Sequence, residues 1–261
     1  MARVRKPAVA GAFYPDDPRE LEAAVKGYLA EAEASGPAPK AMIAPHAGYI
    51  YSGPIAATVY ARLEQARDRI TRVVLLGPAH TVPLAGLALS ETEAFLTPLG
   101  EVPVDTQAVA LIRDLPQVTV MEGAHLREHS LEVQLPFLQE VLADFAIVPL
   151  AVGDATPEEV AEVLELLWGG PETLILVSSD LSHYHDYETA RRLDQATSRA
   201  IEALEPEAIG YEQACGRVPI NGLLTVARRL NLKAETIDLR NSGDTAGSHR
   251  EVVGYGAYVF A

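Results

Sequence analysis

The chain has 261 residues, 48% of them hydrophobic, and its 21 lysines and arginines against 36 aspartates and glutamates give a net charge of −15. This length and apolar content are enough for a full hydrophobic core, which excludes an intrinsically disordered chain. The acidic excess argues against nucleic acid or an anionic membrane surface as the main partner.

The N-terminal sequence and the cysteine content bear on location. Residues 1–17 lack the apolar core of a secretory signal, and no apolar run reaches the length of a bilayer span. The single cysteine, Cys215, excludes an internal disulfide framework and fits a reducing compartment. We therefore expect a soluble cytoplasmic protein.

The first predicted element is a helix with clear boundary signals. Asp17 can cap it, Pro18 suits its first turn, and Gly36 is expected to end it. Apolar residues then recur at helical spacing on one face. They are Leu21, Val25, Tyr28 and Leu29.

Four apolar runs without alternation predict strands that are buried on both faces. They are Ala41–Ala44, Val73–Gly77, Ala146–Val152 and Thr173–Ser179. Amphipathic stretches between them predict helices around Pro54–Gln65, Thr106–Arg113 and Leu131–Leu142. Pro136 should bend or interrupt the last of these helices.

The C-terminal half continues the same pattern. Thr156 caps a helix with a capping-box glutamate, a long helix covers Tyr187–Leu204, and another starts near Pro219. Val252–Phe260 predicts a late strand. With no repeat or linker, residues 1–261 are predicted to form one α/β domain, a three-layer α/β/α sandwich with a mostly parallel or mixed central sheet.

Three of the predicted strands run into polar residues. His46 follows the first strand, His80 the second, and Asp180 with His183 the last. Ligands of open α/β sheets bind beyond the carboxyl ends of the strands, so we expect these side chains to face one crevice. Two imidazoles held at a fixed separation by rigid strands suit a metal ion.

The residues alone leave several roles open. Asp180 could bind a metal or orient an imidazole while His183 acts as general acid or base, or Asp180 could cap the next segment and His183 lie at the rim. His129 and Glu132 would share a helical face and support the site, unless helix capping by Ser130 explains that stretch. Each histidine could also be an ordinary loop residue with its hydrogen bonds satisfied.

Cys215 precedes the helix predicted near Pro219. A helix N-terminus and Arg217 would stabilise a thiolate there, whereas a single cysteine is more often an inert buried residue. The sequence has no Gly-x-Ser-x-Gly nucleophile motif, phosphate loop or dinucleotide fingerprint.

Taken together, these segments resemble the Memo family, whose bacterial and archaeal members are often called AmmeMemoRadiSam system protein B. They keep their order and cover nearly the whole chain, which makes the match specific. The matching segments are Gly11-Ala12-Phe13-Tyr14-Pro15, Ala44-Pro45-His46-Ala47-Gly48-Tyr49 with Ser52-Gly53, Leu76-Gly77-Pro78-Ala79-His80, Glu128-His129-Ser130-Leu131-Glu132, Ser178-Ser179-Asp180-Leu181-Ser182-His183, and Cys215-Gly216-Arg217 with Pro219-Ile220.

The resemblance implies a fold similar to the LigB-type class III extradiol dioxygenases, in which two histidines and a glutamate hold a non-haem iron. On that analogy His46 and His80 match the histidine ligands, and Cys215 stands where the carboxylate is expected. His183 corresponds to the acid–base histidine, and Asp180 lines the same pocket. A set of two histidines and a cysteine is softer, so Fe(II) or copper is favoured and zinc also fits.

The residues and the resemblance favour a metal-dependent oxidoreductase that acts on an unknown small molecule through a single metal ion. Because a cysteine replaces the carboxylate, the alternative is a non-catalytic binding module that keeps the pocket for a peptide or metabolite. Hydrolysis by zinc-activated water ranks third, since two-histidine hydrolytic sites more often add a carboxylate. The family name also implies association with a radical-SAM system protein.

Overall fold

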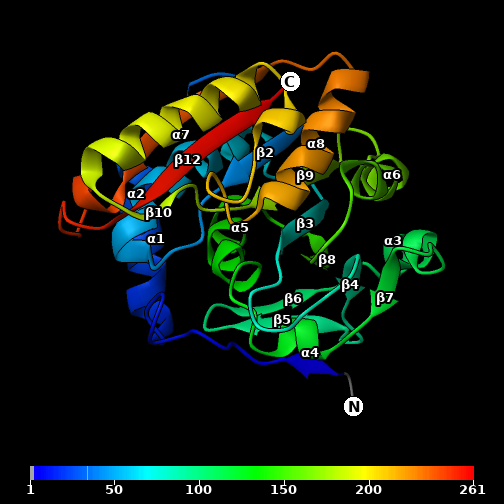
Figure 1. Ribbon diagram of the computed structural model, residues 1–261. Helices are drawn as coiled ribbons and strands as arrows, with labels where there is room; N and C mark the ends of the chain where they lie inside the picture. The colour runs from blue at the N-terminus through cyan, green and yellow to red at the C-terminus, as the bar shows by residue number, and fades with distance from the viewer. Residues whose placement is uncertain (1–2, 34) are drawn as a thin grey trace.

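A mixed β-sheet forms the centre of the computed structural model, which describes residues 3–33 and 35–261 (Figure 1). Its strands are β2 (Ala41–Ala44), β3 (Arg72–Pro78), β4 (Leu87–Leu89), β7 (Val118–Val120), β8 (Ala146–Val152), β9 (Thr173–Ser178), β10 (His183–His185), β11 (Ala234–Asn241) and β12 (Val252–Phe260). The order is β10-β12-β2-β9-β3-β8-β4-β7, and β11 also pairs with β12. Strands β2, β9, β3 and β8 are parallel, whereas β12 and β4 run antiparallel to their neighbours β2 and β8.

Helices cover both sides of this sheet (Figure 1). Helices α1 (Pro18–Glu31), α2 (Tyr49–Tyr60) and α5 (Leu135–Val141) pack together on one side. On the other side lie α6 (Pro157–Leu167), α7 (Tyr187–Glu202) and α8 (Arg217–Arg229), with α3 (Thr106–Ile112) against α6. The predicted α/β class with a mixed sheet between two helical layers is confirmed.

Shorter elements complete the chain. A separate small sheet joins β1 (Val4–Arg5), β5 (Ala94–Thr97) and β6 (Gly100–Pro103) near the N-terminus. The short helices are α4 (Gly123–Leu126), η1 (Ala61–Ala66), η2 (Glu132–Gln134), η3 (Pro206–Ala208) and η4 (Ser242–Asp244). Within the described residues, none of the helices is both long and apolar enough to cross a membrane.

The four predicted strands agree with the structure to within one residue at each end, and the helices agree less well. Helix α1 has the predicted Asp17 cap, but it ends at Glu31 and not at Gly36. Helix α2 begins at Tyr49, so Pro54 lies inside it and does not start it. Pro136 has the expected effect, because a 3₁₀ turn, η2, precedes the α-helical part α5.

The parallel strands explain where the polar residues gather. Strands β2, β8 and β9 carry no exposed residue and β3 is buried after its first residue, as expected for strands covered on both faces. Because β2, β9 and β3 are adjacent and parallel, the segments that follow them leave the same edge of the sheet. His46, Asp180 and His80 follow these three strands.

A buried carboxyl supports the loop that carries His183. Asp194 of α7 is 2% exposed and accepts a hydrogen bond of 3.0 Å from the backbone amide of Ser182. A Cβ at Gly254 would lie 2.1 Å from Asp194 Oδ2, so only glycine leaves room for this carboxyl beside β12. Burial raises the pKa of Asp194 to about 6, and the hydrogen bond from the Ser182 backbone amide opposes this effect without cancelling it.

This shift predicts how stability depends on pH. The folded protein holds the Asp194 proton up to a higher pH than the unfolded chain, so ionisation costs wild type stability as the pH rises from about 4 to 7. Asp194→Asn keeps an acceptor for Ser182 and avoids this cost of about 3 kcal/mol. Urea unfolding at several pH values should show that the free energy of unfolding of the variant increases relative to wild type over this range. Asp68→Asn, at an exposed position, should follow wild type, and a constant difference for Asp194→Asn would contradict the prediction.

Candidate metal centre

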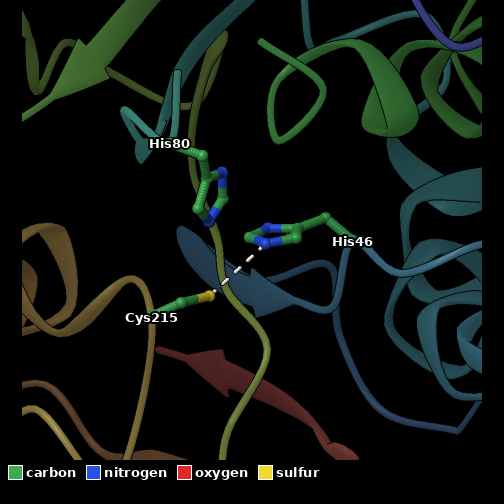
Figure 2. A group of neighbouring side chains, drawn as sticks. All are labelled: His46, His80 and Cys215. Carbon is green, nitrogen blue, oxygen red and sulfur yellow. Dashed lines mark hydrogen bonds between the residues drawn. The ribbon is translucent and has the colours of Figure 1, made fainter. Parts of the chain in front are cut away.

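The structure brings together the three residues predicted to hold a metal (Figure 2). One ligand atom each from His46, His80 and Cys215 lies within 4.8 Å of the other two. Cys215 Sγ is 3.4 Å from His46 Nε2, and the two imidazole rings are 5.3 Å apart in an edge-on arrangement. Two ligands therefore come from strand ends, and the third comes from the loop before α8.

These separations fit a metal ion. Metal–nitrogen bonds of about 2.0 Å and metal–sulfur bonds of about 2.3 Å at tetrahedral angles place ligand atoms roughly 3.5 Å apart. The Sγ–Nε2 distance of 3.4 Å already has this value. Three protein ligands would leave a further coordination position for water or substrate, which is the arrangement of catalytic rather than structural sites.

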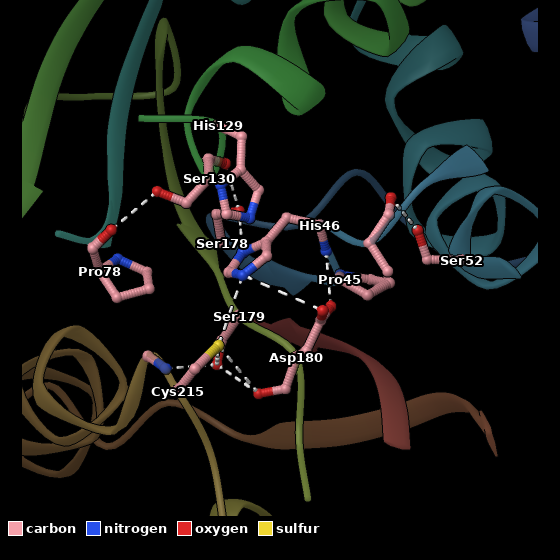
Figure 3. A network of polar contacts seen from close by, with 12 residues as sticks. Pro45, His46, Ser52, Pro78, His129, Ser130, Ser178, Ser179, Asp180 and Cys215 are labelled. Atoms are coloured by element: carbon pink, nitrogen blue, oxygen red, sulfur yellow. Dashed lines mark hydrogen bonds and ion pairs between the residues drawn. The ribbon is translucent and has the colours of Figure 1, made fainter. Parts of the chain in front are cut away.

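His46 is held in the tautomer that a metal requires. Its Nδ1 lies 2.9 Å from Ser178 Oγ, and that hydroxyl donates its hydrogen to the Ser130 carbonyl at 2.6 Å (Figure 3). Ser178 Oγ can then only accept from the ring, so Nδ1 carries the hydrogen and Nε2 presents a lone pair toward Cys215. Burial lowers the pKa of His46 well below its ordinary value, which keeps the ring neutral.

Glu128, which the sequence analysis did not select, holds His80 in the same way. Its Oε1 lies 2.9 Å from His80 Nδ1 and also accepts the backbone amides of His129 and Ser130. Its Oε2 accepts the backbone amide of His80. Burial disfavours the charge, but these hydrogen bonds outweigh burial and lower the pKa of Glu128 to about 2. The carboxylate therefore fixes the ring with Nε2 free, as in carboxylate–histidine–metal arrangements.

Cys215 is a thiol in the protein without metal. Burial raises its pKa to about 12, and the nearby charge of Asp180 adds to the effect. Burial therefore outweighs any lowering of the thiol pKa by the N-terminus of α8. The Arg217 guanidinium lies 3.4 Å from the centre of the Tyr211 ring. A bound divalent cation would favour the thiolate directly, since coordinating thiols lose their proton.

Asp180 is hydrogen-bonded to His46 and, among the described residues, not to His183. Its Oδ1 accepts the backbone amide of His46 at 2.7 Å, and its Oδ2 lies 4.0 Å from His46 Nε2 (Figure 3). Burial raises the pKa of Asp180 above its ordinary value. Among the described residues no hydrogen bond joins Asp180 to His183, which lies half-buried on β10 and lines the same cavity.

His129 also belongs to the site. Its ring stacks on that of His80 with centroids 4.7 Å apart, lies edge-on to His46 at 5.4 Å, and contacts Phe13 at 4.8 Å. His80, Glu128 and His129 form a second group with metal-ligand spacing. Because Glu128 already accepts several hydrogen bonds, we assign it to orienting the histidines and not to binding the ion.

Glu132 and Ser130 have roles other than those expected. Residues 128–131 are not helical, and Ser130 caps no helix, because its hydroxyl donates to the Pro78 carbonyl at 3.0 Å. Glu132 is fully buried and pairs with Arg5 at 2.6 Å. It also accepts the backbone amides of residues 8 and 9 and the hydroxyl of Tyr14. Glu132 thus anchors the N-terminal segment that carries Phe13.

The cavity over these residues has a volume of about 830 Å³. Aromatic rings form much of its wall, and the candidate ligands, His129 and His183 also line it. The lining residues are Phe13, His46, Ala47, Gly48, Tyr51, His80, His129, Asp180, His183, Tyr184, Tyr211, Cys215, Ser242, Gly247, Ser248, Glu251, Val253 and Tyr255.

Comparison with known proteins adds a family match over almost the whole chain. The model of a family described as Memo-like protein matches residues 5–259. A MEMO1 family protein of Aquifex aeolicus is 39% identical over 270 residues, covering 99% of both chains. One from Archaeoglobus fulgidus is 39% identical over 272 residues, covering 98% of this chain and 99% of that one.

A solved structure shares the fold. The crystal structure of the uncharacterized protein JW3007 from Escherichia coli K12 has a TM-score of 0.50 and covers 82% of this chain and 98% of its own. At 14% sequence identity this likeness concerns the fold alone.

Glu128→Gln should weaken metal binding. Each hydrogen-bond partner of this carboxylate among the described residues is a donor, so a glutamine NH₂ would face another donor and release His80 Nδ1 or a backbone amide. Loss of such an orienting carboxylate typically costs tenfold to 100-fold in metal affinity, about 1.4 to 3 kcal/mol. Competition titration with a chromophoric chelator measures this. Glu122→Gln, on a carboxylate that instead accepts from Ser90 and residue 91, is the control, and equal affinities would contradict the assignment.

Glu132→Gln should destabilise the fold and loosen the N-terminal segment. The substitution leaves the buried Arg5 guanidinium without a counter-charge, which we expect to cost about 3 kcal/mol. Amide hydrogen exchange at residues 8 and 9 should accelerate by a larger factor than in the sheet core. Glu91→Gln removes an exposed pair with Arg3 and should change stability by less than about 1 kcal/mol. Equal effects of both changes would contradict the anchoring role.

Proposed function

Because the chain belongs to the Memo family, we propose that it binds a single metal ion through His46, His80 and Cys215 and uses that ion as an oxidoreductase acting on a small molecule. The observation that carries the proposal is the convergence of two oriented imidazoles on one sulfur atom. Both rings are held through Nδ1, so their Nε2 atoms remain for the ion.

The donor set limits the metal. Two neutral imidazoles and one thiolate form a soft, incomplete set, which favours Fe(II) or copper and also accepts zinc. Fe(II) or copper would supply one-electron and dioxygen chemistry that the side chains of the protein lack. Asp180, with Oδ2 at 4.0 Å from His46 Nε2, places a carboxyl beside the ligands without joining their group.

The remaining residues would bind substrate and move protons. His183 lines the cavity, and within the described residues its ring has no hydrogen-bond partner, so either nitrogen can take or give a proton at the substrate. Asp180 fixes the backbone at His46, and Phe13 packs on His129 to close one wall. These groups would orient a small molecule, or a side chain of a peptide, over the metal position.

Metal content tests the first part of the proposal. Protein purified without chelators or a metal-affinity tag should contain about one ion per chain, and His46→Ala/His80→Ala should lose it. Cys215→Ser should remove the thiolate charge-transfer absorption of the cobalt(II)-loaded protein. His249→Ala, where the ring stacks on Tyr187 instead, is the control. Equal metal content and affinity in wild type and the double variant would overturn the proposal.

Oxygen consumption separates an oxidoreductase from a binding module. Protein loaded with Fe(II) or Cu(I) should consume dioxygen in the presence of a reductant faster than the free ion, and zinc-loaded protein should not. His183→Ala should slow the reaction at unchanged metal content if that residue transfers protons. Failure of both redox metals would favour the binding module, which retains its ligands when metal-free.

A further inference from the structure

We propose that the cavity takes an aromatic ligand whose solvent-facing end carries a positive charge, such as a protonated amine. The inference rests on the proposed metal centre only in taking that centre as the floor of the cavity. The ligand class follows from the cavity wall, which the metal assignment does not use.

The wall is rich in aromatic surface. Phe13, Tyr51, Tyr184, Tyr211 and Tyr255 all line the cavity. Tyr184 and Tyr211 are 74% and 79% exposed, which is unusual for such large side chains. Arg217 covers one face of the Tyr211 ring, whereas the Tyr184 ring is accessible to a ligand. Rings around a cavity of about 830 Å³ favour a flat, aromatic ligand and attract cations through their faces.

The wall carries an acidic side chain without a lysine or arginine beside it in the lining. No lysine or arginine of the described residues lines the cavity, whereas Glu251 and several tyrosines line its wall. A phosphate or carboxylate at the outer end of a ligand would lie among these groups without the guanidinium that usually binds it. The net charge of −15 further favours the approach of cations.

Two arginines, Arg217 and Arg250, lie near the cavity without lining it. Arg217 lies over the Tyr211 ring and lines a neighbouring hollow with Asp154. Arg250 is exposed and adjacent in sequence to Glu251. The Arg217–Tyr211 contact, with the guanidinium 3.4 Å from the ring centre, also shows that a ring of this wall accepts a cation.

A matched pair of probes tests the inference. Tyramine and 4-propylphenol share a phenol and a chain of equal length, but only tyramine ends in an ammonium group. Titration calorimetry with zinc-loaded protein, which cannot turn over redox chemistry, should give tyramine an affinity roughly fivefold higher. Burial alone would give 4-propylphenol the higher affinity, because it is the more apolar probe. Tighter binding of tyramine therefore reports on its charge.

A substitution of Glu251 tests whether its charge causes the preference for tyramine. In Glu251→Gln the preference for tyramine should fall to below about twofold, while zinc content stays at the wild-type value. Glu64→Gln changes the net charge equally at an exposed position outside the cavity and should keep the fivefold preference. Equal or tighter binding of 4-propylphenol, binding of neither probe, or an unchanged preference in Glu251→Gln would overturn the inference. Wild type that holds no zinc would instead overturn the proposed metal site.

Discussion

The ionised carboxylate of Glu128 is the interaction on which the geometry of the site depends. It joins the loop after β3 to the segment 128–130 by accepting the ring and backbone of His80 and two further amides. Ser130 then continues this connection, because its hydroxyl donates to Pro78 and its carbonyl accepts from Ser178. Ser178 in turn holds His46. Glu128 thus orients His80 directly and is connected to His46 through Ser130 and Ser178. Because the Ser178 hydroxyl donates to Ser130, it can only accept from the His46 ring.

Local sequence patterns predicted the strands that position the site, because burial on both faces is visible in the apolar runs of the strands themselves. Uninterrupted apolar runs indicated parallel strands buried on both faces, and parallel strands bring their carboxyl ends to one edge. His46, His80 and Asp180 were found by that argument alone. Cys215 was expected only from the family resemblance, because it lies 169 positions from His46 and follows no predicted strand.

The stretch from Glu128 to Glu132 shows what local patterns could not decide. Helical spacing put His129 and Glu132 on one face, but the backbone at residues 128–131 is not helical, and the amides of His129 and Ser130 donate to Glu128. The partners of Glu132 lie 118 to 127 positions away, so no local pattern could reveal them. The sequence marked Glu132 only as a possible supporting residue of the site. Its burial and its partners are known only from the fold.

The groups at the floor of the cavity and the charge on its wall would serve different ligands, the floor a metal ion and the wall an organic molecule. At the floor, burial favours the neutral forms of Cys215, His46 and Asp180. A divalent cation there would reverse this preference for the thiol and the carboxyl, and its two positive charges would be balanced by the two groups it ionises. Glu251, an exposed residue of the cavity wall, takes no part in that balance. Its charge therefore does not depend on whether the floor holds a metal, so we expect a change at Glu251 to act on the proposed ligand and not on the proposed metal site.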